Sequence, residues 1–191
     1  SGGTVVGTLT ISNNTSGSST QTITVTVGSG GSHANTGTSS SSYVSTVIAA
    51  SGTASSIVYG GQTTSAGYGG YGGGFKGDGN AYSNASQGGN SIGSNFSAST
   101  NNSGTSADSY QGGSGDNFSS NGTAGKALAS NPLSLTSTGG TAGSTSGSGT
   151  GGNASGYGAG GGGAAGKDRT SPHHWYGGTG TAGYVRIVAG G

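Results

Sequence analysis

The sequence predicts an all-β, irregular fold: a glycine-rich domain with a small antiparallel sheet, packed polyglycine-II-like segments and essentially no α-helix. Three observations support this prediction. Glycine supplies 48 of the 191 residues, about a quarter of the chain against an average near ~7%. No window places apolar residues at the i, i+3, i+4, i+7 spacing of an amphipathic helix. Short runs near both ends instead alternate between apolar and polar residues, which is typical of strands.

The chain has few large apolar side chains with which to build a core. Leu, Ile, Val and Phe together number 22, and glycine loses more backbone freedom on folding than any other residue. The net charge is only +1, so self-repulsion does not hold the chain open. Because glycine lets backbones approach closely, we expect hydrogen bonds between extended or polyproline-II segments to replace much of the core. The alternative is a disordered, low-complexity chain.

Two strands are predicted near the beginning of the chain, at residues 4–11 and 21–27. In the second run, Ile23, Val25 and Val27 alternate with threonines, which places the three apolar residues on one face of a strand. Turn-forming Ser, Asn, Thr and Gly residues separate the two runs. We therefore expect the two strands to form an antiparallel hairpin.

Three further strands and, at most, one short helical turn are predicted. Residues 43–49 and 56–59 are weaker strand candidates, whereas residues 184–188 alternate clearly. We expect this last strand to join the hairpin in one small sheet that ties the two ends of the chain together. The best helical candidate, residues 126–130, is a single turn, because the Asn131-Pro132 pair ends it.

Glycine recurs at every third position in two stretches, and small residues do so in a third. The stretches are Gly67-Gly70-Gly73, Gly177-Gly180-Gly183, and the run from Gly140 to Ala164, which keeps Gly, Ser or Ala at every third position. Polyproline II has three residues per turn, so such residues line one narrow face on which a neighbouring segment packs closely. The alternative is irregular loop, because small-residue triplets also arise by chance in a chain of this composition.

We expect one glycine-rich domain over residues 1–191. Its parts are a strand-rich region at 1–59, packed glycine-rich segments and loops at 60–180, and a closing strand at 181–191. Ser1 leads directly into a glycine-rich strand pattern, which suggests a fragment or a processed product. No signal peptide is visible, and no apolar run approaches the ~18 residues that span a membrane, so no membrane insertion is expected.

The chain offers little for catalysis, cofactor binding or nucleic-acid binding. The G-x-S-x-G pattern at Gly89–Gly93 lacks the strand and helix that flank a nucleophile elbow. With four Asp and no Glu, a multi-carboxylate calcium site is improbable. His33, His173 and His174 are the only histidines, and adjacent histidines on an extended segment point to opposite faces. We therefore expect no enzyme activity, no cofactor and no metal, and, without a basic patch, no nucleic-acid partner.

Five segments, in order along nearly the whole chain, resemble the glycine-rich domain of phage tail-fibre and tail-fibre adhesin proteins. They are GGTVVGTLTI, QTITVTVGSGG, YGGYGGGFKGDG, YGAGGGGAAG and GGTGTAGYVRIV. In that family a strand ends in Gln-x-x-x-Val-x-Val-Gly-x-Gly-Gly, glycine-rich blocks follow, and a strand of the type Gly-x-Gly-x-x-Gly-Tyr-Val-x-Ile closes the domain. The residues that fit these two signatures are Gln21, Val25, Val27, Gly28, Gly30, Gly31, Gly178, Gly180, Gly183, Tyr184, Val185 and Ile187.

The resemblance implies bundled polyglycine-II helices, a virion location in a tail fibre or surface appendage, and receptor contacts from loops at one end. The glycine runs are shorter than in that family, so tip, shaft and decoration roles all stay open. Aromatic loop residues would suit a host surface receptor, either protein or glycan. The candidate receptor-binding residues are Tyr71, Phe75, Tyr82, His173, His174, Trp175 and Tyr176.

Several other functions compete with the virion fibre. A self-assembling extracellular filament or matrix protein has the same composition, and its strand-rich ends could pair between subunits. An ice-binding protein would use threonines such as Thr22, Thr24 and Thr26, but the regular repeats that it needs are missing. For the virion fibre and for the filament, the expected partners are further subunits of the same fibre or filament, most simply in a homo-oligomer.

Overall fold

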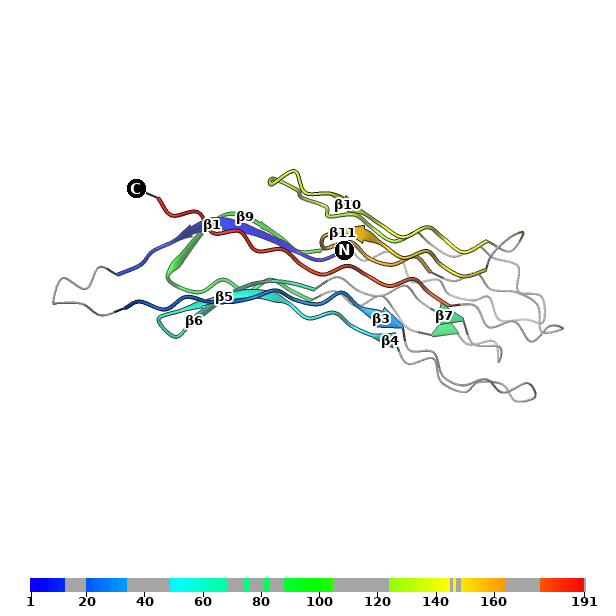
Figure 1. The fold of residues 1–191 in the computed structure, drawn as a ribbon, viewed down its shortest axis with the longest axis horizontal. Helices are drawn as coiled ribbons and strands as arrows, with labels where there is room; N and C mark the ends of the chain where they lie inside the picture. Colours follow the sequence, from blue (N-terminus) through cyan, green and yellow to red (C-terminus); the bar gives the residue numbers. More distant parts are fainter. Residues whose placement is uncertain are drawn as a thin grey trace.

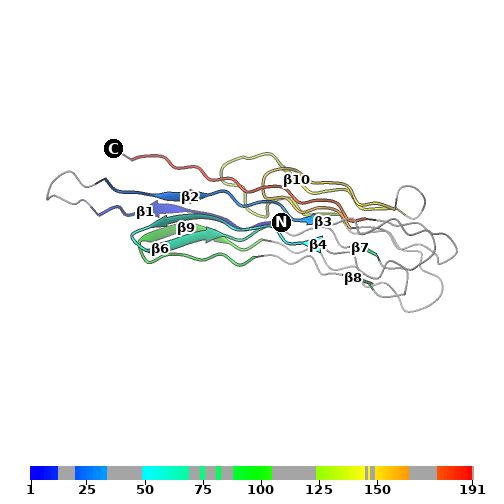
Figure 2. The ribbon, with the colours of Figure 1, turned by 60° about the horizontal axis from the view of Figure 1, so that its bottom comes forward.

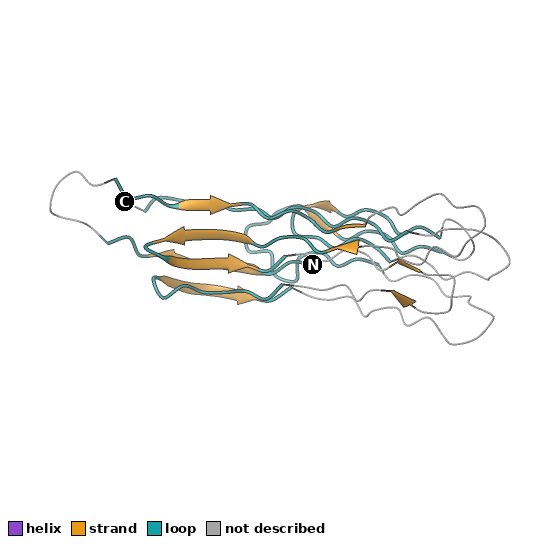
Figure 3. Cartoon of the chain, turned by 90° about the horizontal axis from the view of Figure 1, so that it is seen from below, coloured by secondary structure: helices purple, strands orange, loops and turns teal. Residues whose placement is uncertain are grey.

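The computed structural model describes residues 1–12, 20–33, 49–68, 74–75, 81–82, 88–104, 124–144, 146, 149–163 and 176–190. These segments run lengthwise through an elongated molecule (Figure 1). The longer strands lie in the half that holds the C-terminus, and shorter strands and loops of the described part lie in the other half (Figure 3).

All strands of the described part are short and pair antiparallel. There is no helix in the described residues, so the all-β, irregular fold class is confirmed. The strands are β1 (Thr4–Leu9), β2 (Thr24–Thr26), β3 (Ser32–His33), β4 (Ala49–Ala50), β5 (Ser55–Tyr59), β6 (Gln62–Ala66), β7 (Gly74–Phe75), β8 (Ala81–Tyr82), β9 (Phe96–Asn102), β10 (Ser137–Thr138) and β11 (Ser155–Gly156).

The three-stranded sheet β2-β5-β6 contains a tight hairpin. Tyr59 pairs with Gln62, so Gly60 and Gly61 alone form the connection between β5 and β6. Their φ angles of 58° and 74° are both positive. A two-residue turn with positive φ at both central positions matches the twist of the flanking strands, and glycine adopts it without strain.

The predicted hairpin between residues 4–11 and 21–27 is wrong, although both runs contain strands. β1 pairs with β9, from Thr4 opposite Asn102 to Leu9 opposite Phe96. β2 pairs with β5 instead. Alternation gives a strand its two faces but does not choose its partner.

Close packing of Gly7 against Phe96 accompanies the pairing of β1 with β9. The ladder shifts register between Val6 and Gly7. A side chain at Gly7 would lie 2.6 Å from Cε1 of Phe96 and would collide with the carbonyl oxygen of Ser97. The missing side chain of Gly7 therefore makes room for the Phe96 ring.

The predicted closing strand at 184–188 is also wrong. The Gly183 amide donates to the Gly28 carbonyl at 2.9 Å, but beyond it the described residues show no strand and no backbone hydrogen bond from 184 to 190. This segment therefore does not join a sheet that ties the two ends together.

The other expected elements have mixed outcomes. The strand at 56–59 is confirmed as part of β5. Of the run at 43–49, residues 43–48 lie outside the described part and Ala49 begins β4. Residues 126–130 form no helical turn.

Few large side chains are buried in the described part. Tyr59 and Ala159 are its buried hydrophobic residues, and no large side chain there is fully enclosed. Ala159 has 0% of its surface exposed and is followed in the sequence by buried glycines at 160–162. The core is therefore largely backbone. No helix capable of crossing a membrane occurs among the described segments.

Candidate functional site: a glycine bundle with a tyrosine-lined cleft

Main-chain hydrogen bonds outside any strand ladder join six segments into one unit, which we call the glycine bundle. Its amides and carbonyls pair across segments at 2.7–3.0 Å. The segments are residues 28–31, 124–128, 139–144, 149–156, 158–163 and 176–183.

The amides of segment 176–183 follow a period of three. Gly178 and Thr181 donate to the carbonyls of Gly162 and Ala159, at 2.7 Å and 2.9 Å. The amides that face this neighbour are therefore three residues apart, and the two segments run antiparallel.

A second pair of amides in segment 176–183 points to a different neighbour with the same period. Gly180 and Gly183 donate to the carbonyls of Gly31 and Gly28, both at 2.9 Å. This confirms that the Gly177-Gly180-Gly183 repeat includes a packed face.

Two carbonyls of the same segment bond to a third neighbour, segment 149–156. Those of residues 176 and 179 accept from the amides of Gly151 and Ala154, at 2.7 Å and 2.9 Å. Successive residues of this segment thus form hydrogen bonds to three different neighbouring segments, as expected of a helix with three residues per turn. A β-strand repeats every two residues and forms hydrogen bonds to at most two neighbouring strands.

Other segments of the bundle run parallel with the same spacing. The Gly140 amide donates to the Gly160 carbonyl at 3.0 Å, and the Gly143 amide donates to the Gly163 carbonyl at 2.9 Å. Both partners advance by three residues. This is the pairing expected of parallel polyglycine-II helices.

Segment 158–163 lies at the centre of the bundle, because it exchanges backbone hydrogen bonds with four of the five other bundle segments. These neighbours are residues 124–128, 139–144, 149–156 and 176–183. A strand inside a sheet has only two bonded neighbours. The bundle is therefore a three-dimensional network of backbone bonds.

This network requires glycine because there is no space for a side chain. A methyl group at Gly161 would collide with the carbonyl oxygen of Gly178, and one at Gly162 with that of Thr141. At Gly140 the same group would meet the carbonyl oxygen of Gly152.

The described residues of the small-residue run from Gly140 to Ala164 do not form one continuous face. Residue 146 lies in a turn, and Gly156 and Gly158 have φ angles of 81° and 62°. Positive φ interrupts a polyproline-II helix, whose φ is near −75°. The run therefore folds back on itself, and its small residues are divided among segments 139–144, 149–156 and 158–163.

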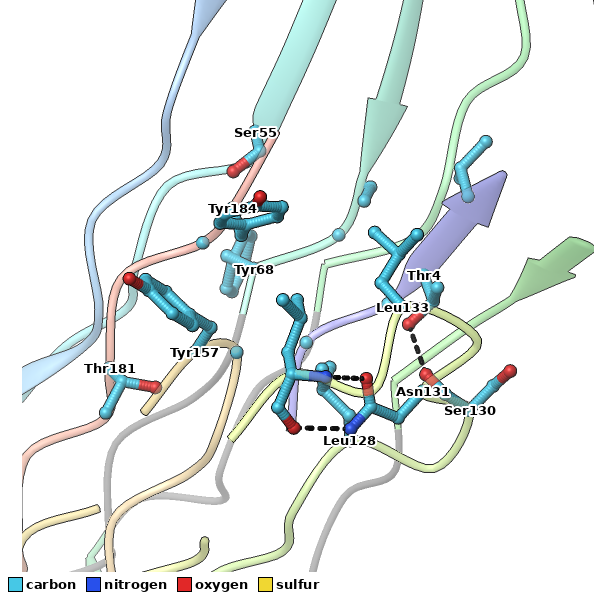
Figure 4. Close-up of a pocket in the computed structure, with 18 of the residues that line it drawn as sticks. Thr4, Ser55, Tyr68, Leu128, Ser130, Asn131, Leu133, Tyr157, Thr181 and Tyr184 are labelled. Atoms are coloured by element: carbon cyan, nitrogen blue, oxygen red, sulfur yellow. Dashed lines mark hydrogen bonds between the residues drawn. The ribbon is translucent and has the colours of Figure 1, made fainter. Parts of the chain in front are cut away.

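A cleft of about 80 Å³ opens where the bundle meets the strands. Tyr68, Tyr157 and Tyr184 lie around it with Leu128 and Leu133 (Figure 4). Further lining residues come from the beginnings of β1 and β5, the end of β6 and the loop 128–135. None of the lining residues is charged.

Two of the tyrosines form an exposed aromatic pair. The ring centroids of Tyr157 and Tyr184 are 5.2 Å apart with an interplanar angle of 57°. Their side chains are 41% and 40% exposed. Aromatic rings at this separation stabilise each other while leaving surface for a ligand.

The opposite wall of the cleft is fixed by hydrogen bonds. The Asn131 side chain accepts from the Leu135 amide at 2.8 Å and donates to the Leu135 carbonyl (Figure 4). The Thr4 hydroxyl donates to the Ser130 carbonyl at 2.8 Å. The loop 128–135 is therefore held against the beginning of β1.

Most of the predicted receptor residues lie outside the described part. Tyr71, His173, His174 and Trp175 do so entirely. For Phe75 and Tyr82 the structure gives backbone positions: Phe75 pairs with Ala81, and Gly74 pairs with Tyr82, in the β7-β8 ladder.

Tyr176 is half-buried, and its carbonyl accepts a bundle hydrogen bond from the Gly151 amide at 2.7 Å. Tyr176 therefore contributes backbone to the glycine bundle.

The cleft tyrosines were missed by the sequence analysis, although they share a signal. Each of Tyr68, Tyr157 and Tyr184 directly follows a glycine. In each case the glycine packs closely against neighbouring atoms, and the tyrosine that follows it lines the cleft. Tyr71 has the same context, so the signal does not by itself choose the cleft residues.

The described residues include no group of three His, Cys, Asp or Glu side chains placed to hold a metal ion. Burial lowers the pKa of the Ser1 amino group, and the positive charge of Lys126 lowers it further.

Comparison of the chain with protein-family models, curated proteins and solved structures found no significant match.

Proposed function

We propose that this chain is a non-catalytic structural and adhesive module of a phage tail fibre or a comparable virion surface appendage. The observation that carries the proposal is the threefold hydrogen-bond pattern of the glycine bundle, in which segment 158–163 bonds to four neighbours. Such a network resists bending without a large apolar core, because its backbone groups are paired in several directions. The elongated outline in Figure 2 suits a rod-like part of a fibre.

The adhesive part of the proposal concerns the aromatic residues Tyr71, Phe75, Tyr82 and 173–176. The β7-β8 ladder places Phe75 and Tyr82 on adjacent rungs, so both aromatic residues belong to one two-stranded ladder and lie on its opposite faces. Large aromatic side chains give contact area at a low cost in conformational entropy. The expected receptor is a protein or glycan on the host surface.

Immunogold electron microscopy of the native particle that carries this chain tests the fibre role. Labels on fibres or fibre tips of a tailed virion would support the proposal. Labels along free filaments built from this chain alone would contradict it. If fibres are labelled, replacing Phe75 and Tyr82 with serine should then reduce adsorption of the particle to its host.

The second candidate function is a self-assembling extracellular filament, and an open sheet edge favours it. In the described part, β2 has a ladder partner only on its β5 side. Val25 and Val27 are exposed there, as are Ile187 and Val188 of the last described segment. Unprotected edges and exposed apolar residues promote pairing between copies.

Light scattering of the purified chain tests this second candidate. Concentration-dependent growth that Val25→Lys abolishes would favour the filament. The control is Ser97→Lys, which places the same charge at another exposed strand position. Ser56→Lys would be less suitable, because β5 is paired on both sides.

A further inference from the structure

We propose that the tyrosine-lined cleft binds a neutral saccharide. The site is the cleft among Tyr68, Tyr157 and Tyr184, at the junction of the glycine bundle with the strands. The inference goes beyond the fibre role, because it needs neither a virion nor a filament.

The aromatic surface of the cleft matches the apolar face of a sugar ring. Tyr157 and Tyr184 are tilted by 57° to each other and are each about two-fifths exposed. A pyranose carries axial C–H groups on one face, and these pack against an aromatic ring. Two tilted rings form a corner that accepts one edge and one face of such a ligand.

Hydrogen-bonding groups are available beside these rings. Within the described part of the chain, the hydroxyls of Tyr68, Tyr157 and Tyr184 have no hydrogen-bond partner. Each can donate one hydrogen bond and accept others. Binding sites pair apolar walls with a few polar groups that orient the ligand, and sugar hydroxyls provide matching partners.

The uncharged lining of the cleft favours neutral ligands over charged ones. No Asp, Glu, Lys, Arg or His lines the cleft. An anionic or cationic group would therefore lose hydration without gaining a counter-charge. A neutral, polyhydroxylated ligand carries no such cost.

The cleft is small, and this limits how much of a glycan enters it. Its volume of about 80 Å³ is roughly half of a ~150 Å³ cavity that holds benzene. The cleft therefore takes part of one sugar unit, and the rest of an oligosaccharide extends over the exposed face of Tyr157.

Ring-resolved NMR of the full chain with labelled tyrosines tests the proposal. The probes are maltotriose, cellotriose and N,N′,N″-triacetylchitotriose, with anionic trigalacturonate for comparison. We expect at least one neutral trisaccharide to shift the ring signals of Tyr157 and Tyr184 and to receive saturation transfer from them. Trigalacturonate should bind at least about tenfold more weakly.

Substitutions then assign the binding to the cleft. Tyr157→Ala and Tyr184→Ala should each weaken binding by about tenfold, because each removes a stacking face. Tyr184→Phe keeps the ring and should weaken it by only about threefold. Val188→Ala changes an exposed apolar residue outside the lining and should leave binding unchanged. Amide spectra establish that each variant keeps its fold.

Three results would overturn the proposal. The first is that no neutral trisaccharide shifts the cleft tyrosines, and the second is that binding persists when Tyr157 and Tyr184 are both alanine. The third is that these ring signals shift with protein concentration alone, which would make the cleft a contact between copies. None of these results bears on whether the chain belongs to a fibre.

Discussion

The amide of Gly140 donates a hydrogen bond to the carbonyl of Gly160 at 3.0 Å, and the bond joins two segments that run in the same direction. Three residues later Gly143 repeats it with Gly163 at 2.9 Å. Between these rungs the chain bonds to another neighbour, because the Thr141 carbonyl accepts from the Gly152 amide. The structure is thus stabilised by backbone groups that point in several directions, where an ordinary domain relies on apolar side chains.

Replacing Gly161 with alanine should destabilise the chain by about 1–3 kcal/mol, because the added methyl group overpacks the bundle. That group would collide with the carbonyl oxygen of Gly178, and backbone on both sides must move. Chemical denaturation measures the loss. Gly89→Ala is the matched control, since nothing lies within 4 Å of a methyl group there, and we expect a change within ~0.5 kcal/mol. Equal effects of the two changes would mean that the segments do not pack closely.

Replacing Gly61 with alanine isolates conformational strain from steric conflict. No atom lies within 4 Å of the added methyl group, but the φ angle of Gly61 is 74°. We expect a loss of about 1–2 kcal/mol, which is the cost of left-handed backbone for a residue with a side chain. Gly61→Asn should lose less, because asparagine tolerates this conformation. If alanine and asparagine cost the same, strain at this turn is not the cause.

The fold class was predictable from the sequence because composition excludes the alternatives. A chain with 48 glycines and 22 large aliphatic or Phe residues has few ways to fold. The Gly177-Gly180-Gly183 repeat likewise indicated a packed face. Strand partners were not predictable, because Gly-, Ser- and Thr-rich segments offer many similar registers. The packing of Gly7 against Phe96 favours the observed register only after β1 and β9 lie side by side.

The cleft was not predictable for a related reason. Its tyrosines lie 89 and 27 positions apart along the chain, and each is carried by a different segment. Their proximity depends on which glycine faces bond to which neighbours. The predicted receptor residues, by contrast, were chosen for aromatic content within single loops, and most of those positions lie outside the described part of the chain.

Replacing Tyr59 with phenylalanine should cost about 1–2 kcal/mol of stability. The Tyr59 hydroxyl accepts from the Ser12 amide at 3.1 Å and donates to Oε1 of Gln21 at 3.2 Å. Removing it leaves both groups without this partner in a half-buried position. Thermal unfolding measures the change. Tyr184→Phe is the control, because the Tyr184 hydroxyl has no partner in the described part, and it should be close to neutral. The same melting temperature for both variants would contradict the bridging role of Tyr59.

Hydrogen exchange should separate the bundled part of the last described segment from its end. The amides of Gly178, Gly180, Thr181 and Gly183 donate to backbone carbonyls of the bundle, and the Thr179 amide donates to Oδ1 of Asn153. We expect these five amides to exchange at least about 100-fold more slowly than an unstructured chain. Residues 185–190 make no backbone hydrogen bond to another described segment, and their amides should exchange close to the unprotected rate. In the Gly161→Ala variant, protection at Gly178 should fall first, because its carbonyl faces the new methyl group. Uniform protection across 178–190 would instead indicate an ordinary strand, and uniform fast exchange would show that the bundle does not persist in solution.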